Sequence, residues 1–150
     1  MSIFVNHPNR GPKAPSKRGQ TLGLFAGTTA GIVQQLEKGF PYSTLVRFQK
    51  TSGFPVGSIA ALVRIPPRTL MRRKAGGRLQ PEESERLLRV SGVFERAVDL
   101  FEGDADSARR WLLTPSKELD NHSPLEFART EIGARDVEDL IGRLEHGVFT

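Results

Sequence analysis

The sequence predicts an all-α protein, on three observations. Apolar residues recur at helical spacing along most of the chain, proline and glycine mark the ends of these runs, and no segment shows the alternation typical of a strand. The chain has 150 residues and no cysteine, so it is long enough for one domain or two small ones and contains no disulfide.

The first 22 residues are predicted to form a flexible basic tail. They are rich in Pro, Gly, Lys and Arg and offer too little apolar surface to offset the entropy of ordering. They also lack the apolar core of a secretory signal, and no apolar run in the chain approaches the length of a membrane span. The absence of cysteine fits a reducing cytoplasm.

Two helices are expected next, over residues 28–38 and from Pro41 to about residue 52. Gly39 ends the first helix, and Gly53 with Pro55 ends the second. Their inward-facing apolar residues are Ile32, Val33, Leu36, Leu45, Val46 and Phe48.

Residues 59–74 predict two short helices separated by a tight break. Pro67 is excluded from a helix interior but fits a first helical turn, so the second helix covers residues 68–74 and ends at the following glycines. Ala60 is small where the helices cross, and Ile65 and Leu70 hold the second helix against the first. This is the pattern of a helix-turn-helix, which lays its second helix in the DNA major groove.

The second helix carries the predicted DNA contacts. Arg68 and Arg72 lie four residues apart on one face, and arginine matches the acceptors of guanine, so we assign base reading to them. Arg64 stands where many such motifs have a left-handed glycine, at a cost of about 1 kcal/mol. The expected phosphate contacts are Arg64, Thr69, Arg73, Lys74 and Arg78. The alternative is a solvated basic helix on an ordinary bundle.

Charge divides the chain into a basic and an acidic half. Residues 1–75 carry 12 Lys and Arg against one acidic residue, whereas residues 76–150 carry 10 against 16. A basic half suits a polyanion and an acidic half is repelled by one, which indicates two different partners. The simpler alternative is that the charge asymmetry only aids solubility.

Longer helices are expected in the acidic half. One runs from Pro81 to about Glu102, with glutamates in its first turns, where the helix dipole favours them. Asp104 caps a second helix, and residues 114–122 form a loop. Ser123 and Glu126 then form a capping box. A last helix covers about residues 131–146. The expected inward-facing residues are Leu87, Val90, Phe94, Val98, Phe101, Ala105, Ala108, Trp111, Leu112, Val137, Leu140, Ile141, Leu144 and Val148.

No pattern supports catalysis or cofactor binding. The three histidines lack metal-ligand spacing, Ser123 fits a helix cap, and the paired glycines after residue 75 fit a helix stop and not a phosphate loop. We predict a protein that is not an enzyme and that holds no metal and no cofactor.

The last 28 residues, SPLEFARTEIGARDVEDLIGRLEHGVFT, carry a more specific pattern. They resemble the C-terminal module of Xre/MbcA/ParS-type antitoxins, which end in Pro-Leu-x-hydrophobic, Thr-x-x-Gly and a helix closed by Gly-hydrophobic. The matching residues are Pro124, Leu125, Thr130, Gly133, Val137, Leu140, Ile141, Arg143, Leu144, Gly147 and Val148. The resemblance covers about residues 55–150.

This resemblance implies a cytoplasmic bacterial antitoxin of a RES–Xre toxin–antitoxin system. Its partner would be a RES-domain toxin that consumes NAD, whose active site the C-terminal segment covers. Its DNA-binding part would repress its own operon by binding double-stranded operator DNA. The residues implied in toxin binding are Leu140, Arg143, Leu144, Glu145, His146, Gly147, Val148, Phe149 and Thr150.

Three parts follow: a flexible tail (1–22), a helix-turn-helix domain (23–80) and a helical dimerisation and toxin-binding region (81–150). We expect a homodimer, because one short recognition helix reads too few base pairs. The helix around residues 94–101 is a candidate dimer surface or an internal core element. The alternative function is a free-standing helix-turn-helix regulator whose acidic half senses a ligand or partner.

Overall fold

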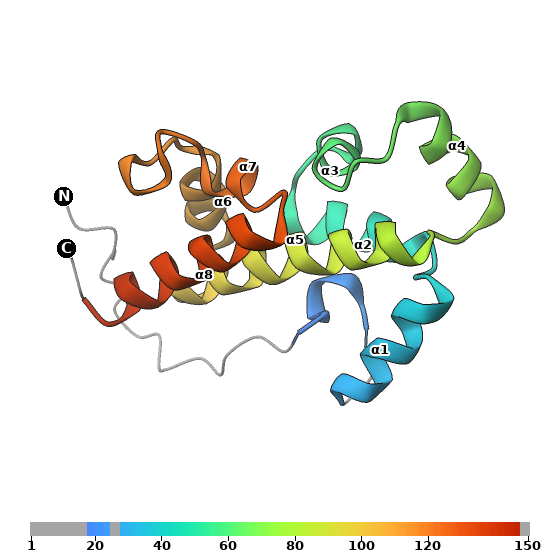
Figure 1. The fold of residues 1–150 in the computed structure, drawn as a ribbon, viewed down its shortest axis with the longest axis horizontal. Helices are drawn as coiled ribbons and strands as arrows, with labels where there is room; N and C mark the ends of the chain where they lie inside the picture. Colours follow the sequence, from blue (N-terminus) through green and yellow to red (C-terminus); the bar gives the residue numbers. More distant parts are fainter. Residues whose placement is uncertain (1–17, 25–27, 148–150) are drawn as a thin grey trace. The chain divides into compact units, whose positions relative to one another are not determined.

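The computed structural model describes residues 18–24 and 28–147, and these fold entirely through helices (Figure 1). They contain two isolated β-bridges and no β-strand, which confirms the predicted all-α class. The elements are η1 (Gln20–Leu22), α1 (Thr29–Lys38), α2 (Ser43–Ser52), α3 (Val56–Leu62), α4 (Pro67–Gly76), α5 (Pro81–Leu100), α6 (Ala105–Leu113), η2 (Lys117–Leu119), α7 (Pro124–Phe127) and α8 (Glu131–Glu145).

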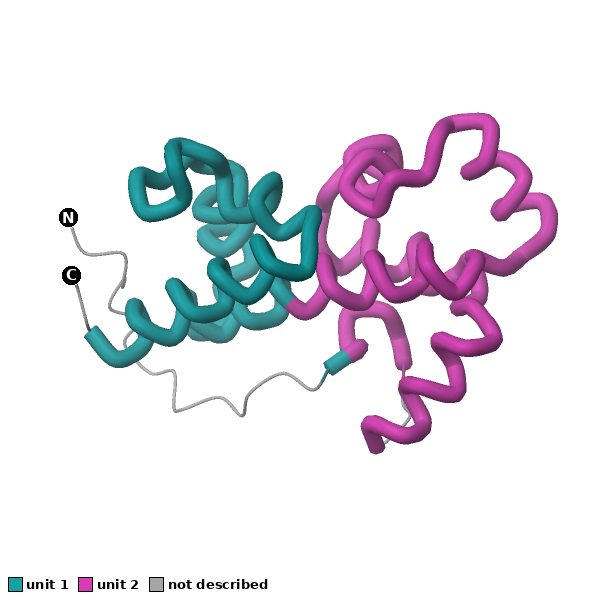
Figure 2. Tube along the Cα trace, in the orientation of Figure 1, with its two compact units in different colours: residues 1–18, 93–150 teal, residues 19–92 magenta. Residues whose placement is uncertain are grey.

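The helices form two compact units, shown in different colours in Figure 2. The first unit comprises residues 19–92, and the second contains residue 93 onwards. The units divide within α5, between residues 92 and 93, whereas the expected domain limits lie at residues 80 and 81 and stay a prediction. Independent folding of residues 23–80 and 81–150 therefore stays a prediction.

The N-terminal unit is built around aromatic and branched side chains from α2, α3 and α5. Phe48 and Phe54 lie with ring centroids 6.4 Å apart, and Gly53 ends α2 in a left-handed conformation, as predicted. Pro41 lies two residues before α2 instead of opening it. The buried apolar residues include Phe40, Leu45, Phe48, Ile59, Val63, Ile65, Leu79, Leu87 and Val90.

The folded part begins before the limit that we drew for the tail. Residues 20–22 form η1, which packs against α2, and Leu22 is only 2% exposed. Burial of one leucine side chain contributes about 1.5–3 kcal/mol toward ordering this segment. Residues 1–17 lie outside the described residues.

Helix α1 follows the prediction at both ends but differs in burial. Thr28 caps it by accepting a hydrogen bond from the Gly31 N–H, and Gly39 ends it. Its apolar face is only half covered, and Val33 is 44% exposed. The helix therefore has no buried residue of its own.

The C-terminal unit is organised by helix caps that the sequence encodes. Asp104 caps α6 and Ser123 caps α7, as predicted, while Thr130 caps α8 by accepting from the Gly133 N–H at 3.0 Å. A Cβ at Gly133 would lie 1.8 Å from the Phe127 carbonyl oxygen. The Thr-x-x-Gly pattern is thus a packing requirement where α7 meets α8.

The second half of α5 supplies the core of this unit. Phe94, Ala97 and Leu100 are at most 2% exposed, whereas Val98 and Phe101 are half-buried. Of the two roles expected for residues 94–101, burial of Phe94 within its own unit favours the internal one. Leu119 in η2 is also buried, so the predicted loop over residues 114–122 is anchored at its centre.

Candidate functional site

The two helices of the predicted helix-turn-helix are α3 and α4, joined by residues 63–66. Pro67 is the first residue of α4, and Ile59, Val63 and Ile65 are buried, as the pattern predicts. Arg64 has φ +58°, which confirms that the turn is left-handed at a position occupied by a side chain. The Ile65 N–H donates to the Ala60 carbonyl at 2.8 Å and closes the turn.

One face of α4 presents basic and apolar side chains to solvent. Arg68 and Arg72 are both exposed on it, and Met71 between them is 72% exposed. The Arg72 guanidinium donates to the Thr69 hydroxyl at 3.3 Å, which holds the arginine side chain along the helix. No hydrogen bond or ion pair joins Arg68 or Lys74 to another side chain of the described residues. This face is therefore open to a ligand.

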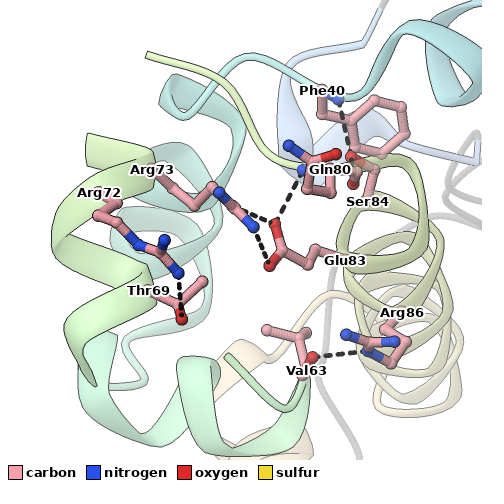
Figure 3. Close-up of polar contacts among 9 residues, drawn as sticks. All are labelled: Phe40, Val63, Thr69, Arg72, Arg73, Gln80, Glu83, Ser84 and Arg86. Atoms are coloured by element: carbon pink, nitrogen blue, oxygen red, sulfur yellow. Dashed lines mark hydrogen bonds and ion pairs between the residues drawn. The ribbon is translucent and has the colours of Figure 1, made fainter. Parts of the chain in front are cut away.

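The Arg73 side chain reaches toward α5 and is held by Glu83 at the start of that helix (Figure 3). Its Nε and Nη2 donate to the two carboxylate oxygens at 2.8 and 3.3 Å. The same carboxylate accepts from the Gln80 N–H at 2.8 Å. The Glu83 side chain is 9% exposed and that of Arg73 21%, so Arg73 does not face outward as expected.

This ion pair governs the pKa of Glu83. Burial raises the pKa of a carboxyl group, but the hydrogen bonds from Arg73 and Gln80, with the charges of Arg73 and Arg86, outweigh it. The pKa of Glu83 is thus lowered, and the hydrogen bond to Glu83 raises the pKa of Arg73. The pair is charged at neutral pH.

Both ends of the motif are also fixed by polar contacts. After α4, the Tyr42 N–H donates to the Gly77 carbonyl and the Leu79 N–H donates to the Phe40 carbonyl, at 2.9 and 2.8 Å. Arg86 of α5 donates to the Val63 carbonyl at the end of α3, at 2.7 Å (Figure 3). Because α4 buries none of its own residues, these contacts and the Arg73–Glu83 pair orient it.

The predicted phosphate contacts therefore differ in availability. Arg78 donates to the Gly39 carbonyl at 2.6 Å and Arg73 is bound by Glu83, so both side chains have roles inside the unit. Arg64 and Lys74 are exposed, and Thr69 is half-buried. The set stays a prediction, with Lys74 on the open face of α4 as its best-placed member.

In the C-terminal unit, α8 has one buried and one exposed side. Val137, Leu140 and Ile141 are at most 5% exposed, so Leu140 offers little surface to a partner, and Leu144 is half-buried. The predicted residues Arg143, Glu145, His146 and Gly147 are exposed. Val148, Phe149 and Thr150 lie outside the described residues.

An open hollow of about 510 Å³ lies on the exposed side of α8. Its lining residues are Arg96, Glu138, Asp139, Gly142, Arg143 and His146. Arg96 of α5 pairs with Glu145 at 3.7 Å, and both side chains are more than a third exposed. Such a surface pair contributes at most about 1 kcal/mol to stability.

The described ranges contain neither a cluster of metal ligands nor a membrane-spanning helix. They contain no group of three or more His, Cys, Asp or Glu side chains placed to hold a metal ion. No helix among them is long and apolar enough to cross a membrane.

Two family models match the chain, and together they span both units. Residues 31–92 match the antitoxin Xre-like helix-turn-helix domain, and residues 96–147 match the antitoxin Xre/MbcA/ParS C-terminal toxin-binding domain. An antitoxin Xre of Yersinia enterocolitica is 42% identical over 130 residues, covering 86% of this chain and 88% of that protein. The chain belongs to the Xre antitoxin family.

Other antitoxins of this name support the assignment. One from Photorhabdus laumondii is 36% identical over 132 residues, 87% of this chain and 89% of that protein. Another from Pseudomonas putida is 32% identical over 84 residues, 55% of this chain and 52% of that protein. The family is non-enzymatic, as the sequence predicted, and its toxin-binding domain favours an antitoxin over a free-standing regulator.

Sequence reasoning missed the contacts that hold the recognition helix of this antitoxin. Glu83 was assigned to the helix dipole, although its position three residues after Gln80 is the spacing of half a capping box. Its pairing with Arg73 has no local signal, because only the fold brings them together. The exposed Met71 and Ile132, and the hollow at Gly142, were also missed.

We predict that the antitoxin loses stability in acid partly through Glu83. A carboxylate whose pKa is lowered by folding stabilises the protein above its unfolded pKa of about 4.3, and that contribution disappears as pH falls through the folded pKa. In urea unfolding, Glu83→Gln should lower the free energy of unfolding at pH 7 by about 1–3 kcal/mol and less at pH 3.

Glu82→Gln is the matched control, because Glu82 is its exposed neighbour in the same helical turn. It should change stability by less than about 0.5 kcal/mol at either pH. Equal effects of the two substitutions at pH 7 would contradict a special role for the Glu83 carboxylate.

Proposed function

We propose that this antitoxin neutralises a RES-domain toxin that consumes NAD, and that it represses its own operon in the bacterial cytoplasm. The C-terminal segment would cover the entrance of the toxin's active site, and α4 would bind double-stranded operator DNA. The observation that carries the proposal is the pairing of a helix-turn-helix unit that presents exposed arginines with a second unit matching a toxin-binding domain.

The open face of α4 supports DNA binding. Arg68 and Arg72 are exposed on one side of a helix whose opposite side is tied to α5, so they are presented away from the core. In this arrangement Arg68 and Arg72 read bases, with Met71 between them suited to a thymine methyl. Arg64 and Lys74 contact phosphates, while Arg73 positions α4 through Glu83.

The exposed side of α8 supports toxin binding. Arg143, Glu145 and His146 stand at its C-terminal end, beside acidic side chains on the same helix. A toxin that holds a dinucleotide needs a cationic surface, which an acidic helix complements. The resemblance of the terminal residues to antitoxins of RES-domain toxins supports this partner over other toxin classes.

A homodimer fits the operator role. Helix α4 has ten residues and reads only a few base pairs, so two copies on a two-fold symmetric operator supply the remaining contacts. Because Phe94 is buried in the core of its own unit, we propose that the dimer contact lies elsewhere on the chain.

Arg72→Ala should weaken operator binding by about 1–3 kcal/mol, because it removes a base contact, and should leave toxin neutralisation intact. Arg110→Ala is the matched control. Arg110 is an exposed arginine of α6 that also donates to a hydroxyl three residues earlier, at 3.1 Å. The operator affinity of each variant is measured by titrating labelled operator DNA with the protein.

Salt dependence separates base contacts from phosphate contacts. Lys74→Ala should reduce the slope of log K on log salt by about 0.9, the value for one lost phosphate contact.

An unchanged affinity for Arg72→Ala, or equal losses for Arg72→Ala and Arg110→Ala, would remove α4 from the DNA interface.

Deleting residues 147–150 should abolish neutralisation of the toxin and leave operator binding unchanged. The reason is that the deletion takes away the covering segment without touching the unit that carries α4. Toxin-dependent NAD loss and operator binding are measured on the same preparations. A truncated chain that still protects NAD would show that the terminal segment does not cover the active site.

A further inference from the structure

The structure contains a helical glycine that the fold itself does not require. Glycine within a helix is about 1 kcal/mol less favourable than alanine. At Gly133 this cost has an internal cause, because a Cβ would collide with the Phe127 carbonyl. At Gly142 of α8 a Cβ would meet no atom within 4 Å. No contact with the described residues therefore explains the glycine at position 142.

Gly142 lies in the hollow on the exposed side of α8, between charged side chains. Along α8, the lining residues Glu138 and Asp139 precede Gly142, and Arg143 and His146 follow it. No hydrogen bond or ion pair joins the Glu138 or Asp139 carboxylate to another described residue. Arg96, which also lines the hollow, is paired with Glu145 at 3.7 Å. The carboxylates of Glu138 and Asp139 are thus available to a cationic partner.

We propose that a backbone segment of the toxin crosses α8 at Gly142 and directs a lysine or arginine side chain to Glu138 and Asp139. Glycine permits the close backbone approach, because a side chain at this position would hold the two chains apart. The proposal rests on the function proposed above and extends it to a second contact, separate from the terminal segment.

Continuity with the toxin-binding region supports this occupant. The hollow lies wholly within residues 96–147, the range that matches the toxin-binding domain, and its lining ends at His146. The terminal segment that we propose as the cover begins at the next residue, Gly147. A toxin engaged by that segment therefore has the hollow directly beside it, and the acidic side chains complement its cationic surface.

The test is Gly142→Ala in the full-length antitoxin, with Gly92→Ala as its matched control. Gly92 is also a helical glycine whose Cβ would meet nothing within 4 Å, but it lies in the unit that carries α4. Both substitutions should keep or raise the thermal unfolding midpoint. Gly142→Ala should raise the Kd for the cognate RES-domain toxin of the proposed function at least tenfold, and Gly92→Ala should leave it unchanged.

A second arm tests the charge. Removing both carboxylates, with Glu138→Gln and Asp139→Asn together, should raise the same Kd at least fivefold at low salt and less at high salt. Asp136→Asn removes an exposed carboxylate of α8 outside the hollow and should have no effect.

The outcomes separate the two proposals. If Gly142→Ala and the double variant both bind the toxin as tightly as the unaltered chain, while deletion of residues 147–150 abolishes binding, the contact at Gly142 is overturned and the proposed function stands. If the unaltered antitoxin fails to bind the RES-domain toxin, both are overturned.

Discussion

The ion pair between Arg73 and Glu83 is the contact on which the presentation of the recognition helix depends. Helix α4 has no fully buried residue and Leu70 is only half-buried, so apolar packing alone fixes its rotation weakly. The buried Glu83 carboxylate instead accepts two hydrogen bonds from the Arg73 guanidinium of α4. It also accepts from the Gln80 N–H and so caps the start of α5. A buried pair contributes little net stability after desolvation, but its geometry is specific, and orientation is what a recognition helix needs.

Most of the fold could be predicted because the helix ends are determined by a few neighbouring residues. Pro67 at the start of α4, the left-handed Arg64, and the caps at Asp104 and Ser123 are each readable from a few neighbouring residues. The limit of the tail was wrong because burial of Leu22 depends on α2, which lies far along the chain. Periodicity identifies an apolar residue but not the distant surface that covers it.

The candidate sites show the same limit more strongly. Every basic residue of residues 64–78 was read as a DNA contact, because a sequence pattern counts charge and does not show which charges the fold itself uses. Arg73 and Arg78 are bound by Glu83 and by the Gly39 carbonyl, and Leu140 packs into its own core. The toxin-binding domain match over residues 96–147 agrees with the family resemblance, while the individual toxin contacts stay a prediction. The open space above Gly142 is visible only in three dimensions.

A double-mutant cycle on operator binding tests the central claim most directly, using Arg73→Gln, Glu83→Gln and the double variant. If the pair orients α4, each single change weakens binding by about 1–3 kcal/mol, and the double change costs no more than either alone. The slope of log K on log salt stays the same for all three. If Arg73 instead contacts a phosphate, Arg73→Gln alone weakens binding and lowers that slope, while Glu83→Gln leaves binding unchanged or strengthens it, and the account is contradicted.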